Sequence, residues 1–152
     1  SAQSRRRAAQ EAEQDGLRFA PWPEDAPMPA SSMPALEAAK AALAQGEAAF
    51  QRYDRALFRA FFERCLDIAD AAVLEALARA ESLDAGRLRR EVEEGQHRGA
   101  VLADFAECLE RYGPWASGVP LAVFGATPPL VGAAPVEVYR TAVLRQLNPL
   151  SA

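Results

Sequence analysis

The chain has 152 residues and a formal net charge of −4 at pH 7, and half of its residues are hydrophobic. This length suits one domain with a sizeable core. No apolar run approaches the ~20 residues that span a bilayer, and an acidic chain is a poor partner for nucleic acid, whose binding depends on neutralising phosphates. We therefore expect a cytoplasmic protein that binds neither a membrane nor nucleic acid, although a mature secreted chain would also lack a signal peptide.

The first part of the chain is predicted to be helical, with one proline-rich interruption. Residues 4–15 are strong helix formers, and Gly16 ends that run. The stretch "APWPEDAPMPASSMP" must be an extended, irregular connection, because proline removes a backbone donor and fixes φ. Ser31 or Ser32 can cap the helix that follows, which should run to Gly46.

A longer helix is expected from about Glu47 to Cys65, because large apolar residues recur there at three- and four-residue steps. The members of this stripe are Phe50, Tyr53, Leu57, Phe58, Phe61 and Phe62. An aromatic stripe of this kind is typical of a helix face that packs in a core. The residues expected to form one helical core are Phe58, Phe61, Phe62, Leu74, Leu77 and Phe105.

Further helices are predicted before the chain changes character. Asp70 can cap one helix, and Asp84 can cap the next, which Gly95 ends. Apolar residues at helical spacing then mark a helix over 101–112. Apart from the proline-rich connection, the segment as far as residue 116 is therefore predicted to be helical.

Side chains with reactive chemistry are few. Cys65 and Cys108 belong to no CxxC or zinc pattern, so we expect two free thiols on helical faces, and a disulfide only if the two helices are neighbours. His97 has no serine or cysteine partner at a telling position. The acidic run "EVEEG" over 91–95 is interpreted as a solvated face. We therefore predict no metal site and no catalytic residue in this chain.

The residue pattern changes only after residue 119. "LAVF" and "PLVG" are short apolar stretches on either side of a Pro-Pro turn, and they predict a β-hairpin near 121–124 and 129–132. Pro135 then stands where helices begin, and apolar residues continue at helical spacing beyond it. On the residues alone, the Val119–Pro120 step before the hairpin favours an ordinary trans proline at the start of an edge strand.

This order of elements resembles the DsbA-like thioredoxin-fold family, which includes bacterial disulfide oxidoreductases, 2-hydroxychromene-2-carboxylate isomerases and kappa-class glutathione transferases. The stretches that carry the resemblance are "ALFRAFFERCLDIADAAVLEALA" (56–78), "LDAGRLRREVEEGQHRGAVLADFAECLERYG" (83–113) and "SGVPLAVFGATPPLVGAAPVEVYRTAVL" (117–144). The resemblance implies a mainly α (α+β) fold. Residues 1–116 would form the family's helical insert domain, and residues 117–152 would form a C-terminal ββα part of the thioredoxin-like fold.

The resemblance also shapes the expected site. In that family, a strand and a CxxC or single-residue active site precede the helical insert, and nothing in this chain corresponds to them. It therefore implies that the redox-active N-terminal half is absent and that no residue here is the catalytic cysteine. It further implies a cis Val119–Pro120 bond, with Gly118, Val119 and Pro120 aligning an extended thiol substrate.

The implied function is that of a thiol–disulfide oxidoreductase acting on a protein or small thiol, inactive as this chain alone. One alternative is a glutathione-dependent isomerase or transferase, although Ala133 and Ala134 stand where glutathione-using relatives carry polar residues. Glutathione is the only cofactor left open. The other alternative is a non-catalytic helical interaction module. Because the hairpin lacks neighbouring strands, we expect a homo-oligomer or association with the missing N-terminal segment.

Overall fold

The computed structural model describes residues 18–116 and 118–147. The helix predicted over 4–15 lies outside these residues. The described chain is mostly helical with a small antiparallel sheet, which confirms the predicted fold class. It divides into two compact units, Ser1–Leu102 and Ala103–Ala152. This boundary falls within a helix, whereas the division into 1–116 and 117–152 rests on the family resemblance and stays a prediction.

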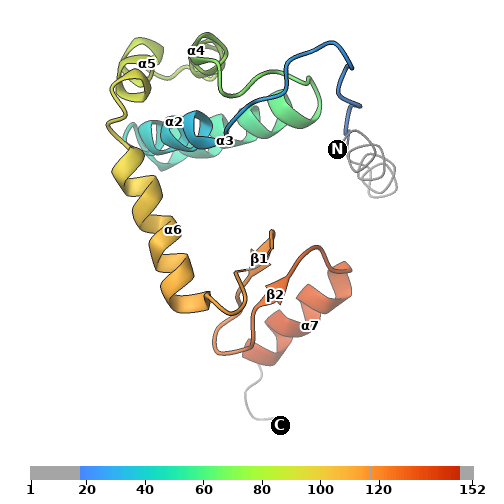
Figure 1. The fold of residues 1–152 in the computed structure, drawn as a ribbon. Helices are drawn as coiled ribbons and strands as arrows, with labels where there is room; N and C mark the ends of the chain where they lie inside the picture. The colour runs from blue at the N-terminus through green and yellow to red at the C-terminus, as the bar shows by residue number, and fades with distance from the viewer. Residues whose placement is uncertain (1–17, 117, 148–152) are drawn as a thin grey trace. The chain divides into compact units, whose positions relative to one another are not determined.

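The first unit is built from helices in two layers (Figure 1). Helices α2 (Met33–Leu43) and α3 (Glu47–Phe62) form one layer, and α4 (Ala71–Ala80) and α5 (Ala85–Glu93) cover one side of it. Short turns join consecutive helices, so each helix packs against the one before it. This arrangement buries one face of every helix in a shared core.

The ends of α4 and α5 follow from local sequence, as predicted. The Asp70 carboxylate accepts a hydrogen bond from the backbone N–H of Ala72 at 2.8 Å. The Asp84 carboxylate accepts one from the N–H of Arg87 at 2.9 Å. Each bond satisfies a donor that a helix N-terminus would otherwise leave unpaired. Beyond α5, Gly95 takes a φ of 63°, the left-handed conformation that glycine adopts readily at a helix C-terminus.

The start of α2 is capped by a different serine from the one at the cap position. Ser32 occupies that position, but its hydroxyl makes no capping hydrogen bond. The hydroxyl oxygen of Ser31 instead accepts the N–H of Met33 at 3.0 Å. The side chain of Ser32 is therefore not used in holding the helix.

Helix α3 ends three residues earlier than predicted. The N–H of Leu66 bonds the carbonyl of Ala60 at 2.9 Å, which closes the helix end, and Cys65 takes a φ of 52° in the turn. Cys65 therefore lies in a turn, and the prediction that it stands on a helical face was wrong. Apolar periodicity continued past Phe62, but the backbone had already left the helix.

The core of the first unit consists mainly of alanine and leucine around one tyrosine. Its buried members are Ala35, Ala38, Ala41, Ala42, Tyr53, Leu57, Ala60, Leu74, Leu77, Ala78, Ala85 and Leu88. Tyr53 is fully buried, and its hydroxyl donates to the carbonyl of Leu74 at 3.1 Å. Burial raises the pKa of the Tyr53 phenol well above its usual value, so the group stays neutral. Because alanine side chains are small, the alanines of α2 allow both α3 and α5 to pack closely against α2.

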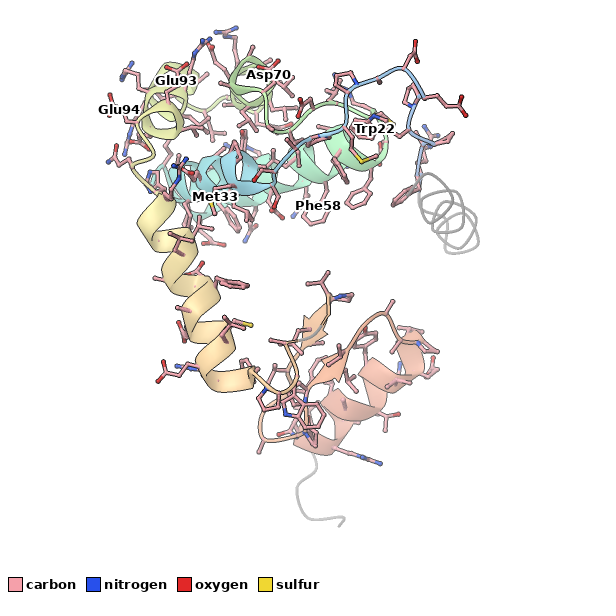
Figure 2. The ribbon with its side chains drawn as sticks, viewed as in Figure 1. Trp22, Met33, Phe58, Asp70, Glu93 and Glu94 are labelled. Carbon is pink, nitrogen blue, oxygen red and sulfur yellow. The ribbon has the colours of Figure 1, made fainter. Side chains whose placement is uncertain are left out.

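The expected aromatic core was only partly correct. Leu74 and Leu77 are buried, but Phe58 is 58% exposed and Phe105 is 63% exposed. The buried face of α3 is the one that carries Tyr53, whereas Phe58 lies about 140° from it around the helix. Phe61 and Phe62, about 80° and 180° from Tyr53, are half-buried. Figure 2 shows Phe58 pointing away from the layer of α4 and α5. The phenylalanines of α3 therefore form a second apolar face at the surface of the unit.

The second unit contains a hairpin followed by a helix. Helix α6 (Arg98–Tyr112) leads into it from the first unit. Strands β1 (Leu121–Ala122) and β2 (Leu130–Val131) pair antiparallel, with Leu121 opposite Val131, and α7 (Val136–Leu147) follows. The predicted hairpin and last helix are confirmed, although both strands are shorter than expected. No residue of α7 is buried within the described chain.

The difference between the two faces of α3 can be measured in stability. Leu74→Ala should lower the free energy of unfolding by about 2–5 kcal/mol, because it leaves a cavity in the core. Phe58→Ala should lower it by less than about 1 kcal/mol, since most of that side chain is in solvent. Urea unfolding followed by circular dichroism measures both. Equal losses for the two variants would contradict this assignment of the buried face.

Candidate functional site

The residues predicted to align a substrate form a loop that leads into β1. The Val119–Pro120 peptide bond is cis, as the family resemblance implied. The carbonyl of Pro120 accepts a hydrogen bond from the N–H of Gly132 at 2.8 Å. This bond lies next to the Leu121–Val131 pair and extends the strand pairing by one step. The loop is therefore fixed to the hairpin.

The loop offers its backbone to solvent at Val119. That residue is 90% exposed, and neither its N–H nor its C=O makes a hydrogen bond within the described part of the chain. A side chain at Gly118 would bring its Cβ to 3.3 Å from the Cγ1 of Val131. Glycine therefore keeps the loop close to β2. A free donor and acceptor beside a strand are the groups that pair with an extended chain.

Tyr139 of α7 holds the segment after β2, at the end of the hairpin where Gly132 pairs with Pro120, a role that the sequence did not predict. Its hydroxyl accepts the N–H of Ala134 at 3.2 Å and donates to the carbonyl of Gly132 at 3.4 Å. Its ring lies 6.1 Å from that of Phe124, centre to centre, in an edge-on contact. In the sequence Tyr139 is only one apolar position of a helical pattern. The sequence held no signal for its partners.

The start of α7 bears on the glutathione alternative. Ala133 and Ala134 bring no polar side chain to this position. Backbone N–H groups at a helix start can attract an anion, but the N–H of Ala134 is already bonded to the Tyr139 hydroxyl. This position therefore offers a carboxylate fewer free N–H donors than a helix N-terminus with unpaired N–H groups.

Comparison with known proteins gives the family. A family model for the DSBA-like thioredoxin domain matches residues 6–144. The chain belongs to that family. No curated protein matches it. The chain is thus a thioredoxin-like protein of the DsbA-like family, and the family predicted from the sequence is confirmed.

The two cysteines of this DSBA-like chain are free thiols and half-buried. The Cys65 sulfur lies 3.8 Å and 3.6 Å from the carbonyl oxygens of Ala20 and Pro21. Carbonyl oxygens accept the thiol proton and do not stabilise a thiolate, which needs nearby positive charge. The Cys65 setting therefore does not resemble that of a reactive nucleophile. Cys108 lies on α6, in the second unit.

His97 belongs to a polar cluster built around two buried carboxylates in the first unit. Its Nε2 lies 2.8 Å from one carboxylate oxygen of Glu91, and the Nε of Arg87 donates to the other oxygen at 2.6 Å. Next to His97 in sequence, Arg98 donates to the fully buried carboxylate of Glu37 at 2.9 Å. The interpretation of residues 91–95 as a wholly solvated face was wrong, because Glu91 is 6% exposed. The cluster joins α2, α5 and the start of α6, which is a structural role.

No group of three or more histidine, cysteine, aspartate or glutamate side chains in residues 18–116 and 118–147 is placed to hold a metal ion. Within the same residues, no helix has both the length and the apolar character needed to cross a membrane.

The buried Glu91 should make stability depend on pH. Burial alone would raise the pKa of Glu91, but hydrogen bonds and charge from His97 and Arg87 outweigh it, so the pKa lies below its usual value. A depressed folded-state pKa adds stability above the unfolded pKa, and this stability is lost as the pH falls through the folded value. Glu91→Gln should therefore lower the free energy of unfolding by about 1–3 kcal/mol at pH 7.

The same measurement at low pH checks the sign. The difference between Glu91→Gln and the unaltered protein should shrink once the pH falls below the usual glutamate pKa of about 4.3. The exposed Glu94 near the same helix end gives the matched control, and Glu94→Gln should change little at either pH. Urea unfolding at several pH values measures all three proteins. A difference that grew toward low pH would contradict the assigned direction.

Proposed function

We propose that this DSBA-like chain acts in thiol–disulfide exchange and that Gly118, Val119 and Pro120 align an extended, thiol-bearing polypeptide. The observation that carries the proposal is the backbone of Val119, which is exposed and free to pair beside β1. The chain has no CxxC, Cys65 faces carbonyl oxygens rather than positive charge, and Cys108 is a lone free thiol on α6. We therefore propose that the attacking thiol is not one of these two cysteines.

The loop's contribution to the exchange would be positional. In thiol–disulfide exchange a thiolate attacks one sulfur of a disulfide, one S–S bond forms as the other breaks, and the leaving thiolate takes up a proton from solvent. The three sulfurs must lie nearly in line, so the rate depends on how firmly the substrate is held. The N–H of Val119 would donate to the substrate backbone and its C=O would accept from it. Because these contacts involve main-chain atoms, they suit many polypeptide sequences.

A direct test is binding of an extended peptide at the loop. Val119→Pro removes the N–H and should weaken binding of a ten-residue Gly/Ser/Thr peptide with one central cysteine by about fivefold, the equivalent of one hydrogen bond. The same substitution at Val136, the first residue of α7, is the control, because proline is tolerated there. Backbone NMR shifts measure affinity and place. Peptide at millimolar concentration with no shift near residues 118–120 would refute the proposal.

Two assays separate the alternatives for this chain. We predict that the chain does not catalyse insulin reduction by dithiothreitol. Cys65→Ser and Cys108→Ser should leave the rate of insulin reduction unchanged. Turnover that either substitution abolished would make one of these thiols catalytic, against our assignment. Calorimetry with glutathione tests the isomerase or transferase alternative, for which we predict no measurable heat of binding. Micromolar glutathione binding would instead favour that alternative.

We further propose that the hairpin is completed by another strand. Two two-residue strands make a marginal sheet, and the sheet of the described chain has only this pair. Val123 and Val131 add exposed apolar surface beside it. Such an edge is a template for pairing. A second copy of the chain, or a separate segment that carries the family's other strands, would fill it.

Sedimentation at micromolar concentration tests this association. We expect a species larger than the monomer, or a monomer whose amides in residues 119–132 exchange rapidly until a partner strand is added. The helical unit serves as the internal control, because amides of α3 and α4 should be protected in both cases. A monodisperse monomer with well-protected amides over 119–132 would contradict the proposal.

A further inference from the structure

The first unit has a cleft that is lined by residues of α2 and by the second apolar face, the phenylalanines of α3. It has a volume of about 150 Å³ and is lined chiefly by the apolar side chains of Leu36, Phe58, Phe61 and Phe62. Leu36 is 47% exposed and Phe58 is 58% exposed. The labelled Phe58 stands on the side of α3 away from α4 and α5 (Figure 2). The cleft therefore opens on the Phe58 side of α3, and the core residues Ala35 and Leu57 form part of its wall.

Two polar groups lie among these apolar walls, and neither is engaged. Asp54 lines the cleft one turn before Phe58, and its carboxylate makes no hydrogen bond or ion pair within the described chain. Ser32 also lines it, with a hydroxyl that makes no capping bond because Ser31 takes that role. A free carboxylate beside an apolar cleft attracts a cation or a hydrogen-bond donor. The lining therefore suits an apolar group in the cleft with a positively charged group next to it, close to Asp54.

The size of the cleft decides what kind of molecule fits. Sites for whole drug-sized ligands measure about 300–1,000 Å³. A cavity of about 150 Å³ holds one benzene-sized group. The cleft therefore matches one large side chain of a longer molecule, and most of that molecule would remain outside.

We propose that this cleft binds one aromatic or large aliphatic side chain of a polypeptide, with a neighbouring lysine or arginine of the same polypeptide paired with Asp54. The rings of Phe58 and Phe62 are stacked, with centroids 5.9 Å apart, and such rings pack against both aromatic side chains and cations. The inference rests on the proposed function in one respect, since that function makes a polypeptide the substrate. It adds a side-chain preference for apolar residues next to basic ones.

Three short peptides test the preference on the full chain. The first is acetyl-Gly-Ser-Phe-Lys-Ser-Gly-amide, and the others replace its lysine by glutamate or its phenylalanine by alanine. NMR titration should show shifts at residues that line the cleft, with the first peptide bound most tightly. Replacing lysine by glutamate should weaken binding about fivefold, the upper range for an exposed ion pair. Equal affinity for all three peptides, or no shift at the cleft at millimolar concentration, would overturn the proposal.

Substitutions in the chain test the charged part and the apolar part of the binding preference separately. Asp54→Asn should remove most of the advantage of lysine over glutamate, while Glu94→Gln removes the same charge elsewhere in the unit and should leave it intact. Phe58→Ala should weaken the first peptide about tenfold, and Phe105→Ala, which removes an exposed ring outside the cleft, should not. An advantage of lysine that survives Asp54→Asn would overturn the role of Asp54.

Binding at the cleft and binding at the loop are measured separately, so either proposal can fail without the other. The peptides contain no cysteine, and their shifts are read at α2 and α3 rather than at the loop. Val119→Pro should leave this binding unchanged. Loss of loop binding with cleft binding intact would refute only the thiol-exchange proposal, and the reverse result would refute only the side-chain preference.

Discussion

Two buried carboxylates hold the first unit together where α6 begins. Glu37 on α2 and Glu91 on α5 are almost inaccessible to solvent, and they bind the consecutive residues Arg98 and His97. A buried charge costs several kcal/mol unless it is paired, so these contacts constrain the backbone between α5 and α6. The second oxygen of Glu37 is buried without a hydrogen-bond partner in the described chain, which makes its bond to Arg98 the more important. The turn at Gly95 permits this geometry by adopting a left-handed conformation.

Features that depend on a few neighbouring residues could be predicted from the sequence. The caps at Asp70 and Asp84 require only a carboxylate before a helix, and the hairpin requires two short apolar stretches around a turn. The buried face of α3 could not be chosen in this way, because two adjacent faces of that helix are apolar. Tyr53 is buried because its hydroxyl reaches a carbonyl of α4, a contact between elements that periodicity does not contain. Glu91 was misjudged for the same reason, since its burial depends on Arg87 and His97.

The candidate site shows the same distinction between features that the sequence predicts and features that depend on contacts in space. The loop at Val119 and Pro120 was found through resemblance to a family, because on residues alone an ordinary trans proline was the better expectation. Tyr139 and Asp54 were not found. What matters at Tyr139 is a pair of hydrogen bonds to the turn after β2. What matters at Asp54 is the lack of a partner beside an apolar cleft. Neither property is a pattern in sequence, because each depends on what lies nearby in space.

The composition of the core explains why the phenylalanine face of α3 is left at the surface of the first unit. Alanine contributes little apolar area when it is buried, so most of the core's large side chains are a few residues such as Tyr53, Leu74 and Leu88. Phe58 and the phenylalanines beside it are not needed there, and exposed apolar groups of that size mark places where another molecule binds. The cleft on α3 can accept a side chain, and the loop before β1 can accept a main chain. Backbone pairing can supply affinity and a side-chain pocket can supply specificity, and each of these two proposed contacts belongs to its own unit of the chain.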